Sequence, residues 1–222
     1  MLKADLHIHT CYSHDCTTSI EAIIDRCLEL GINCIAVTDH NTIAGGLEMQ
    51  KCAPFPIIVG EEIKTPYGEI IGLFVGQEIP PGLSPQETVS RIKAQGGLVC
   101  IPHPFDRVRR SPLKPQMIDA ILPQTDIIEI FNSRTTLLRD SAKAQAFARS
   151  HGLLASAGSD AHTCYEIGHA YVELPEFSGV EDFRQALAQG IIVGRRSNPW
   201  VHLASSLAKW RRSRTASKAA SR

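Results

Sequence analysis

The sequence predicts an α/β fold, a distorted TIM-like (β/α)7 barrel formed by a single domain. Apolar, β-branched runs alternate with segments of helical periodicity along the 222 residues, which is the pattern of repeated βα units. Six of these runs end in His, Asp, Glu or Asn, and a barrel active site needs polar groups at the carboxyl ends of its strands. Some runs have no full helix after them, so seven units fit better than eight. A doubly wound open sheet presents polar groups at the same ends and is the alternative.

The predicted strands form two groups. Runs rich in Val and Ile and shorter than a helix favour strands. The six that end in a polar residue span 4–9, 34–40, 56–62, 98–103, 126–132 and 153–162. Three further strands are expected at 70–76, 171–174 and 191–194.

Four helices are predicted between these strands. The segment 19–30 has apolar residues on one face and stops at Gly31. Ser84-Pro85-Gln86-Glu87 is a capping box with proline at the first helical position, and this helix closes at the Gly96-Gly97 pair. Further helices are expected at 141–150 and 180–188 because a glycine follows each of them closely.

The composition indicates a domain that buries its own core inside the cell. Hydrophobic residues make up 43% of the chain. The seven cysteines are scattered and never spaced as C-x-x-C, which argues against a disulfide framework and favours the reducing cytoplasm. No run approaches the roughly 18 apolar residues that a membrane span needs, so we expect no membrane insertion.

Charge separates the end of the chain from the remainder. After Asp182 the sequence has nine basic residues and no acidic one, although the net charge of the whole chain is zero. We therefore expect a catalytic domain over residues 1–200 and a basic tail over 201–222 that passes from helix to disorder. Contact with RNA is the functional alternative for this tail.

Two short segments near opposite ends of the chain carry five possible metal ligands. They are Asp5-Leu6-His7-Ile8-His9 and Gly158-Ser159-Asp160-Ala161-His162, and both end predicted strands. Side chains alternate along a strand, so His7 and His9 share a face and can grip one ion together. Imidazole nitrogens combined with carboxylate oxygens suit zinc, manganese or iron(II) better than calcium or magnesium.

The ordered set of motifs resembles the PHP (polymerase and histidinol phosphatase) family of metal-dependent phosphoesterases over roughly residues 3 to 200. The resemblance rests on these motifs, all in the family's order: Asp5-x-His7-x-His9-Thr10, Ser13-x-Asp15, Thr38-Asp39-His40-Asn41, Gly60-x-Glu62-Ile63, Pro102-His103-Pro104, Glu129-x-x-Asn132 and Gly158-Ser159-Asp160-Ala161-His162. It implies the PHP fold, a distorted barrel with two or three divalent metal ions, and hydrolysis of phosphate esters.

The resemblance also implies the ligands. His7, His9, Glu62 and Asp160 would hold one ion, and Glu62 would bridge to a second ion that His103 binds. Asp15, His40 and His162 would hold a third. We choose Glu62 over Glu61 because the family pattern places the ligand two residues after Gly60, and alternation sends the two carboxylates to opposite faces. We expect Asp5, Asp39 and Glu129 to orient the ligands without touching metal.

Two histidines that some members of the family carry are absent, one in the strand around residues 69–73 and one near Asn132. Glu69 can replace the first if its side chain faces the mouth of the barrel. We expect two ions to be held well and a third weakly. Manganese is the ion we expect to support activity, with zinc and iron as the other candidates.

The candidate metal ligands indicate hydrolysis by a metal-activated water. A water held by two divalent ions loses its proton near neutral pH, and this hydroxide attacks the phosphate. His162 or His40 is the candidate proton shuttle. Arginine matches phosphate oxygens, so the expected substrate contacts are Arg134, Asn132, Arg107, Arg109 and Arg110.

The sequence therefore favours a phosphoesterase that acts on a small phosphorylated metabolite or a nucleotide. The alternatives are an exonuclease acting on RNA or DNA ends, which the basic tail favours, and a non-catalytic regulatory domain of the same family. Retention of all eight candidate ligands argues against the last.

Overall fold

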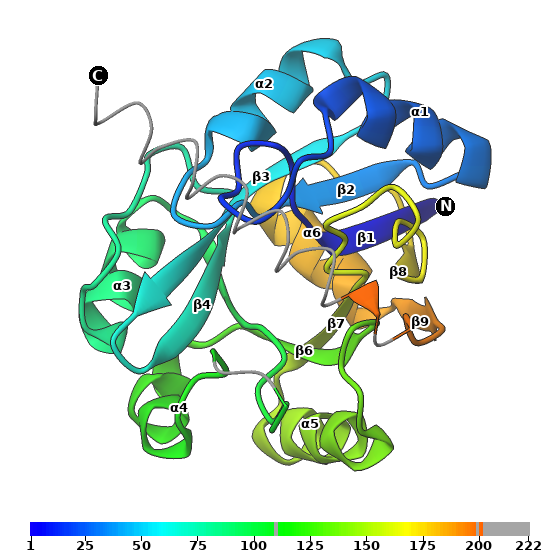
Figure 1. The fold of residues 1–222 in the computed structure, drawn as a ribbon. Helices are drawn as coiled ribbons and strands as arrows, with labels where there is room; N and C mark the ends of the chain where they lie inside the picture. Colours follow the sequence, from blue (N-terminus) through cyan, green and yellow to red (C-terminus); the bar gives the residue numbers. More distant parts are fainter. Residues whose placement is uncertain (109–110, 199, 202–222) are drawn as a thin grey trace.

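The computed structural model describes residues 1–108, 111–198 and 200–201. These residues form one sheet of nine strands in the order β7-β6-β5-β4-β3-β2-β1-β8-β9 (Figure 1). The strands are β1 (Leu2–Ile8), β2 (Cys34–Val37), β3 (Ile57–Thr65), β4 (Gly68–Leu73), β5 (Leu98–Ile101), β6 (Ile127–Asn132), β7 (Leu154–Gly158), β8 (Ala170–Leu174) and β9 (Ile191–Gly194). All nine lie where the sequence predicted strands.

The first seven strands curl into a nearly closed barrel. Just beyond the end of β7, the amide of Asp160 donates to the carbonyl of His7 over 2.8 Å, and the amide of His9 donates to the carbonyl of Ala161 over 3.0 Å. These bonds join the end of β1 to the segment after β7. On the same edge of β1, away from β2, β8 pairs antiparallel with the start of the strand, and β9 pairs antiparallel with β8. The predicted distorted TIM-like barrel is confirmed, and the open sheet is excluded.

One strand of the barrel, β4, runs antiparallel to its neighbours. β1, β2 and β3 are parallel to one another, as are β5, β6 and β7, but β4 is antiparallel to both β3 and β5. The repetition of parallel βα units is therefore interrupted at β4. The physical reason is the connection: Thr65 pairs with Gly68, so only two residues join β3 to β4, and such a short turn joins antiparallel strands only.

Six α-helices surround the described part of this sheet: α1 (Ile20–Leu30), α2 (Ala44–Cys52), α3 (Pro85–Ala94), α4 (Pro115–Ile121), α5 (Leu138–His151) and α6 (Gly179–Ala188), with a short 3-10 turn at Leu122–Gln124. The sequence analysis found α1, α3, α5 and α6. It missed α2, which begins at Ile43 without a side-chain cap and contains two glycines, both of which weaken the helical signal. It also missed α4, whose start is marked only by Pro115.

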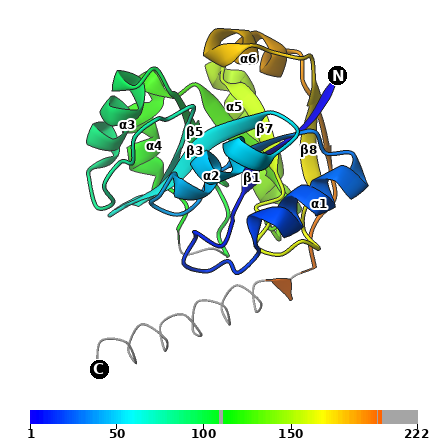
Figure 2. The ribbon, with the colours of Figure 1, turned by 90° about the horizontal axis from the view of Figure 1, so that it is seen from above.

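Three apolar clusters hold the barrel together. The interior cluster includes Ala36, Ile58 and Ile71, and α6 adds Phe183 to it. Figure 2 shows α6 at the end of the barrel opposite the loop that follows β1. The two outer clusters lie under α1 and α2, and under α3 and α4. Because apolar side chains fill the far end, only the end near the β1 loop is left for polar groups.

No helix among the described residues has the length and apolar character that crossing a bilayer requires. The predicted basic tail, apart from Val201, lies outside the described residues.

Candidate metal centre at the carboxyl ends of the strands

A β-bulge in β1 aims the first two histidines into the barrel. Leu6 packs in the interior cluster, whereas Ile8, two residues later, packs in the outer cluster under α1. Regular alternation would put both on one face, and the pairing of β1 with β2 slips by one residue between Asp5 and Ile8. The bulge brings His7 and His9 into the mouth and turns Asp5 away from them.

Four donor atoms converge at the floor of this mouth. Nε2 of His9 lies 3.2 Å from Nε2 of His7, 3.3 Å from Oε2 of Glu62 and 3.4 Å from Oδ1 of Asp160. Nε2 of His7 lies 3.6 Å from the same Glu62 oxygen and 3.7 Å from the same Asp160 oxygen. A tetrahedral ion with bonds of about 2.1 Å keeps its ligand atoms roughly 3.4 Å apart. The four side chains therefore fit a divalent ion such as zinc, manganese or iron(II).

The charges around this point favour a cation. Burial disfavours the charged form of His9, yet the nearby carboxylates of Asp160 and Glu62 raise its pKa to about 10. Burial is likewise outweighed at Glu62, where His40, His7 and His103 hold the pKa of the carboxyl well below its usual range. The raised pKa of His9 and the lowered pKa of Glu62 have one cause: a positive charge among these side chains balances the buried carboxylates, as a bound metal ion would.

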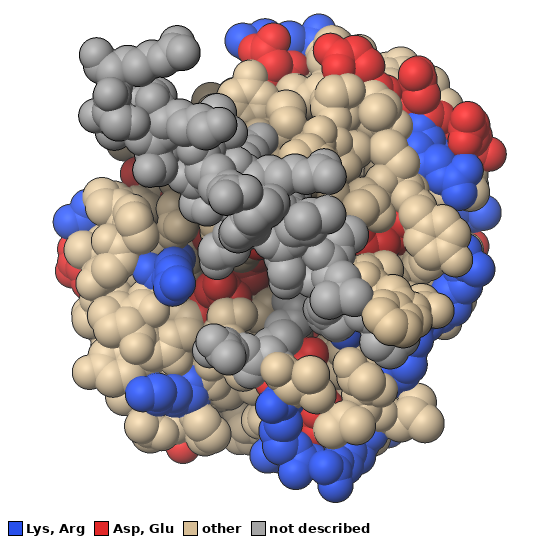
Figure 3. Space-filling view, viewed as in Figure 1, with Lys and Arg blue, Asp and Glu red and all other residues tan. Residues whose placement is uncertain are grey.

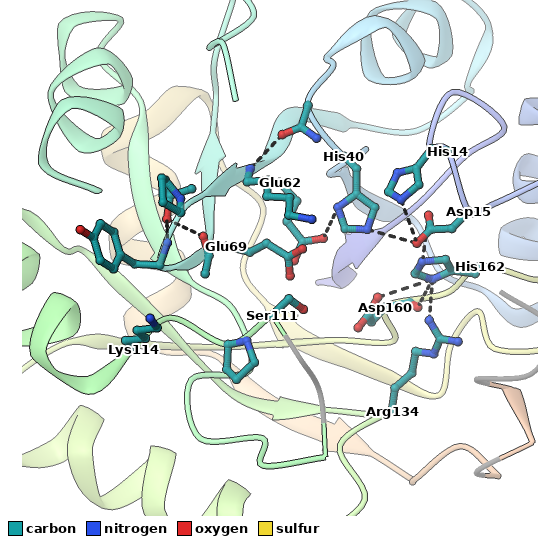
Figure 4. A pocket seen from close by; sticks show the side chains of 17 residues that line it. His14, Asp15, His40, Glu62, Glu69, Ser111, Lys114, Arg134, Asp160 and His162 are labelled. Atoms are coloured by element: carbon teal, nitrogen blue, oxygen red, sulfur yellow. Dashed lines mark hydrogen bonds and ion pairs between the residues drawn. The ribbon is translucent and has the colours of Figure 1, made fainter. Parts of the chain in front are cut away.

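A second group lies beside the first. Oδ2 of Asp15 is 3.4 Å from Nε2 of His40, and Oδ1 of Asp15 is 3.4 Å from Nε2 of His162. Figure 4 shows both imidazoles directed at this carboxylate. Nδ1 of His40 also lies 3.1 Å from Oε2 of Glu62, so the second group adjoins the first. Asp15, His40 and His162 can hold one further ion.

A third group consists of His103 and the other carboxylate oxygen of Glu62. Oε1 of Glu62 lies 3.2 Å from Nε2 of His103, on the side away from His9. Glu61, its neighbour in β3, turns outward, where its Oε2 accepts the amide of Ile79 over 2.9 Å. The structure thus brings all eight candidate ligands together and directs Glu62, not Glu61, at the histidines.

Buried polar groups hold these ligands from behind. Nδ1 of His7 lies 3.0 Å from Oε1 of Glu129, and Nδ1 of His9 lies 3.0 Å from the Ser13 hydroxyl. Asp39 accepts from the amide and hydroxyl of Thr10 at the end of β1, over 2.7 Å each. These contacts leave each Nε2 of His7 and His9 pointing into the mouth.

Asp5 contacts backbone and not an imidazole. Its Oδ1 accepts the amide of Ser159 over 2.8 Å and faces the amide of His7 at 3.4 Å. Burial raises the pKa of this carboxyl to about 7. Asp5 therefore joins β1 to the end of β7, and Glu129 contacts the His7 ring instead.

Close backbone packing sets the position of Asp160. A Cβ added at Gly158 would lie 2.3 Å from Cβ of His7, so only glycine lets β7 approach β1 this closely. Two residues later Asp160 has φ of 53°, in the left-handed region. The turn directs Oδ1 of Asp160 toward His9 and Oδ2 toward Nδ2 of Asn132, 3.1 Å away.

The three groups open into one pocket of about 470 Å³. Figure 3 shows acidic side chains inside the hollow at the centre of this face and separate groups of Lys and Arg side chains around it. The lining includes Asp15, His40, Glu62, Asp160 and His162 from the ligand groups, together with Glu69. The arrangement suits a substrate whose negative charge is drawn past a basic rim to bound cations.

Of the predicted substrate contacts, Arg134 lines this pocket. Its guanidinium lies 3.1 Å from Oε1 of Glu166 and donates over 2.9 Å to Nδ1 of His162. Asn132 is buried against Glu129 and Asp160, outside the lining. Arg107 pairs with Asp140 at 3.2 Å and is also outside it. Arg109 and Arg110 lie outside the described residues.

Sequence reasoning missed several residues here. Glu166 is fully buried and accepts the amide of His162 over 3.1 Å. A glutamate inside a loop with no ligand spacing carries no signal for such a role. His14, Lys64, Tyr67 and Lys114 line the pocket, and only their closeness to motif residues could have suggested it.

Comparison with known proteins agrees with the fold. The family model described as the PHP domain matches residues 5–90, and the model described as PHP-associated matches residues 139–191. An uncharacterised protein of Methanocaldococcus jannaschii is 42% identical over 60% of this chain and 82% of its own length.

Two solved structures share the fold. One is a two-domain protein from Bacteroides vulgatus that contains a predicted PHP-like metal-dependent phosphoesterase, with a TM-score of 0.72 and 18% identity over 87% of this chain. The other is Endonuclease Q in complex with a duplex substrate carrying an abasic lesion at the active site, with a TM-score of 0.66 and 16% identity over 85% of this chain. This chain spans 65% of the first protein and 56% of the second.

The fold and the pocket define a TIM-like barrel with histidine and carboxylate groups gathered at one mouth. The matches to both family models and to the archaeal relative identify the family, and the chain belongs to the PHP family.

Proposed function

We propose that this protein is a metal-dependent phosphoesterase that hydrolyses a phosphate monoester or a nucleotide phosphoester. The observation that carries the proposal is the meeting of His7, His9, Glu62 and Asp160. The two imidazole Nε2 atoms lie 3.2 Å from each other and 3.3–3.7 Å from one oxygen of each carboxylate. Two or three bound ions, with manganese as the expected one, would supply Lewis acidity and an activated water. His103 would share the second ion with Glu62, and Asp15, His40 and His162 would hold the third.

The chain's own residues prepare the pocket for an anion. Arg134 is 5% exposed and brings a permanent positive charge next to His162. We propose that Arg134 binds the phosphate group of the substrate, because a guanidinium can donate to two phosphate oxygens at once. Lys64 and Lys114 on the opposite wall draw the remainder of a negatively charged substrate into the pocket.

His162 is one candidate proton shuttle, and it can transfer a proton only through a ring nitrogen that holds no metal ion. Burial and the neighbouring His9 lower its pKa to about 4, so the ring is neutral at pH 7. Its Nδ1 can accept from Arg134 or donate to the carbonyl of Asp160, each 2.9 Å away. Both tautomers therefore have a partner, which a proton-transferring imidazole requires. His40 is the second candidate for this role.

The second candidate function is cleavage of nucleic acid. The observation that favours it is the pair formed by Tyr67 and Lys114 on the pocket wall, where Nζ of Lys114 lies 5.4 Å from the ring centroid. An aromatic ring and a cation side by side suit a base and a phosphate of one strand. The fold likeness to Endonuclease Q is consistent with this candidate.

We also propose a cytoplasmic location, because all seven cysteines are free thiols.

Two readouts with the purified protein and Mn²⁺ test the proposal: phosphate release from the small molecules and strand cleavage, followed on a gel, for the nucleic acids. The panel holds mononucleotides, nucleoside 3′,5′-bisphosphates, histidinol phosphate, short RNA and an abasic duplex. We expect turnover of one small-molecule class, and Asp160→Ala should abolish it. A matched control is Asp119→Ala, because Asp119 lies on the outer helix α4 and outside the pocket lining. Turnover of the RNA or the duplex alone would support the second candidate, and no turnover with metal bound would contradict both.

A further inference from the structure

We propose that Glu69 is a metal ligand that completes the cation position between Glu62 and His103. This inference rests on the proposed metal-dependent function and names a residue that this chain uses there.

The first support is the direction of the Glu69 side chain. Ile71 and Leu73 of β4 pack in the interior cluster, whereas Ile70 packs in the outer one. Glu69 has the same parity as Ile71 and Leu73, so it also points into the barrel, at the end that forms the mouth. Figure 4 shows the carboxylates of Glu69 and Glu62 directed at the same part of the pocket. The strand thus delivers an acidic side chain to the ligand groups.

The second support is geometry. Nε2 of His103 lies 3.2 Å from Oε1 of Glu62 and 4.0 Å from Oε2 of Glu69. Ligand atoms of His40, Glu62 and Glu69 also lie within 4.8 Å of one another. Since ligands on one ion stand roughly 3.4 Å apart, a small side-chain rotation brings Glu69 to bonding distance of an ion already held by Glu62 and His103.

The two oxygens of Glu62 separate this position from the first. Oε2 is 3.3 Å from Nε2 of His9, while Oε1 faces His103. A bridging carboxylate of this kind holds two ions side by side, and the second ion needs ligands of its own. Glu69 and His103 supply one oxygen and one nitrogen for it, which is a donor set that manganese, iron(II) and zinc accept.

The third support is the cost of leaving Glu69 without a cation. Its side chain is 8% exposed and lies beside the carboxylate of Glu62. Among the described residues, no lysine or arginine forms an ion pair with it within 4.0 Å; His103 is its partner at that distance. Its backbone is held in place, because the amide donates to the carbonyl of Ser111 over 3.0 Å. A divalent ion would compensate two buried carboxylates that otherwise repel each other.

Metal stoichiometry tests the proposal without measuring activity. The full-length protein is stripped with chelator, titrated with Mn²⁺ by equilibrium dialysis and analysed by mass spectrometry of the bound metal. We expect Glu69→Gln to lose one Mn²⁺ per chain, or to bind it at least about tenfold more weakly, and Glu69→His to retain it. Glu61→Gln is the matched control: it removes a neighbouring buried carboxylate that faces outward, and it should bind metal as the unmodified protein does.

A second set of variants identifies the shared ion and guards against misfolding. His103→Gln should lose the same ion, and the double variant Glu69→Gln/His103→Gln should lose no more than either single variant.

Unchanged stoichiometry and affinity of metal binding in Glu69→Gln would overturn the proposal. Two separate losses of metal that add in the double variant would also overturn it. If the protein binds Mn²⁺ as expected but releases no phosphate, the proposed function fails while Glu69 stands. If phosphate is released and Glu69→Gln changes no metal binding, the Glu69 assignment alone fails.

Discussion

Oε1 of Glu129 lies 3.0 Å from Nδ1 of His7, so a carboxylate on β6 holds an imidazole on β1 across the barrel. The other oxygen of Glu129 accepts the amide of His103 over 2.8 Å. One buried side chain thereby orients a candidate ligand of the first ion and anchors the backbone of a candidate ligand of the second. This relationship suggests that the two ions are coupled through Glu129 as well as through Glu62.

Replacement of Glu129 by glutamine tests this coupling. We expect Glu129→Gln to weaken Mn²⁺ binding about 10- to 100-fold, because an amide orients the His7 ring less strongly and raises its basicity less than a carboxylate does. Calorimetric titration of the metal-free protein measures the change. Glu181→Gln, at a side chain 78% exposed on α6, is the control and should bind as the unmodified protein does. Equal affinities for Glu129→Gln and the control would show that Glu129 has only a structural role.

A methyl group at Gly158 should disrupt the junction of β1 and β7. Its Cβ would meet Cβ of His7 at 2.3 Å, so Gly158→Ala must displace the strand that carries two candidate ligands. We expect a loss of about 1–3 kcal/mol in the free energy of unfolding, together with weaker metal binding. Urea denaturation measures the first quantity. Gly76→Ala is the matched control, because a Cβ there meets nothing within 4 Å. Similar stability of the two variants would contradict the observed packing.

Removal of metal should make stability fall with rising pH. The folded-state pKa of His9, about 10, is raised above its usual value of 6.5 by Asp160 and Glu62 despite the opposing effect of burial. A raised histidine pKa contributes stability that is fully present below the unfolded value and is lost as pH rises through the folded value. We therefore expect the Tm of the metal-free protein to fall between pH 7 and pH 10, as followed by circular dichroism.

Bound metal should reverse this trend. Because metal and proton compete for the same imidazole, Mn²⁺ binding strengthens as pH rises and releases protons to the buffer. The stabilisation by Mn²⁺ should consequently grow over the same pH range. The control is His151→Gln, whose exposed ring lies on α5 outside the pocket. A metal-free protein whose Tm is constant from pH 7 to pH 10 would count against a protonated His9.

Arg134 and Arg107 should differ in their effect on the substrate. Arg134 lines the pocket, whereas Arg107 pairs with Asp140 outside it. With the substrate that the panel identifies, we expect Arg134→Lys to raise KM roughly 10- to 100-fold, because a charge-assisted hydrogen bond is lost. Arg107→Lys should leave KM unchanged. A fall in kcat and in metal content with KM unaffected would instead mean that Arg134 acts through His162 and Glu166.

Local sequence patterns predicted most of the fold. The β-branched runs predicted all nine strands, and the caps at Ser19 and Ser84 predicted α1 and α3, because strand and helix periods and capping depend on neighbouring residues. The antiparallel direction of β4 also has a local cause, since two residues between Thr65 and Gly68 allow only a hairpin. α2 was missed because tertiary packing of Met49 stabilises a helix that its uncapped start does not favour.

The candidate ligands were identified from the sequence through the resemblance of its motifs to those of the PHP family, which place Glu62, two residues after Gly60, among the ligands. Only the tertiary structure decided how those ligands are supported and which further groups join them. The bulge in β1 breaks the alternation that would have set Asp5 beside His7, and Glu129 contacts the ring instead. The burial of Glu166 and Arg134, and the direction of Glu69 toward His103, follow from contacts between residues far apart in the chain. Such contacts depend on how strands curve and pack, and a linear pattern does not contain them.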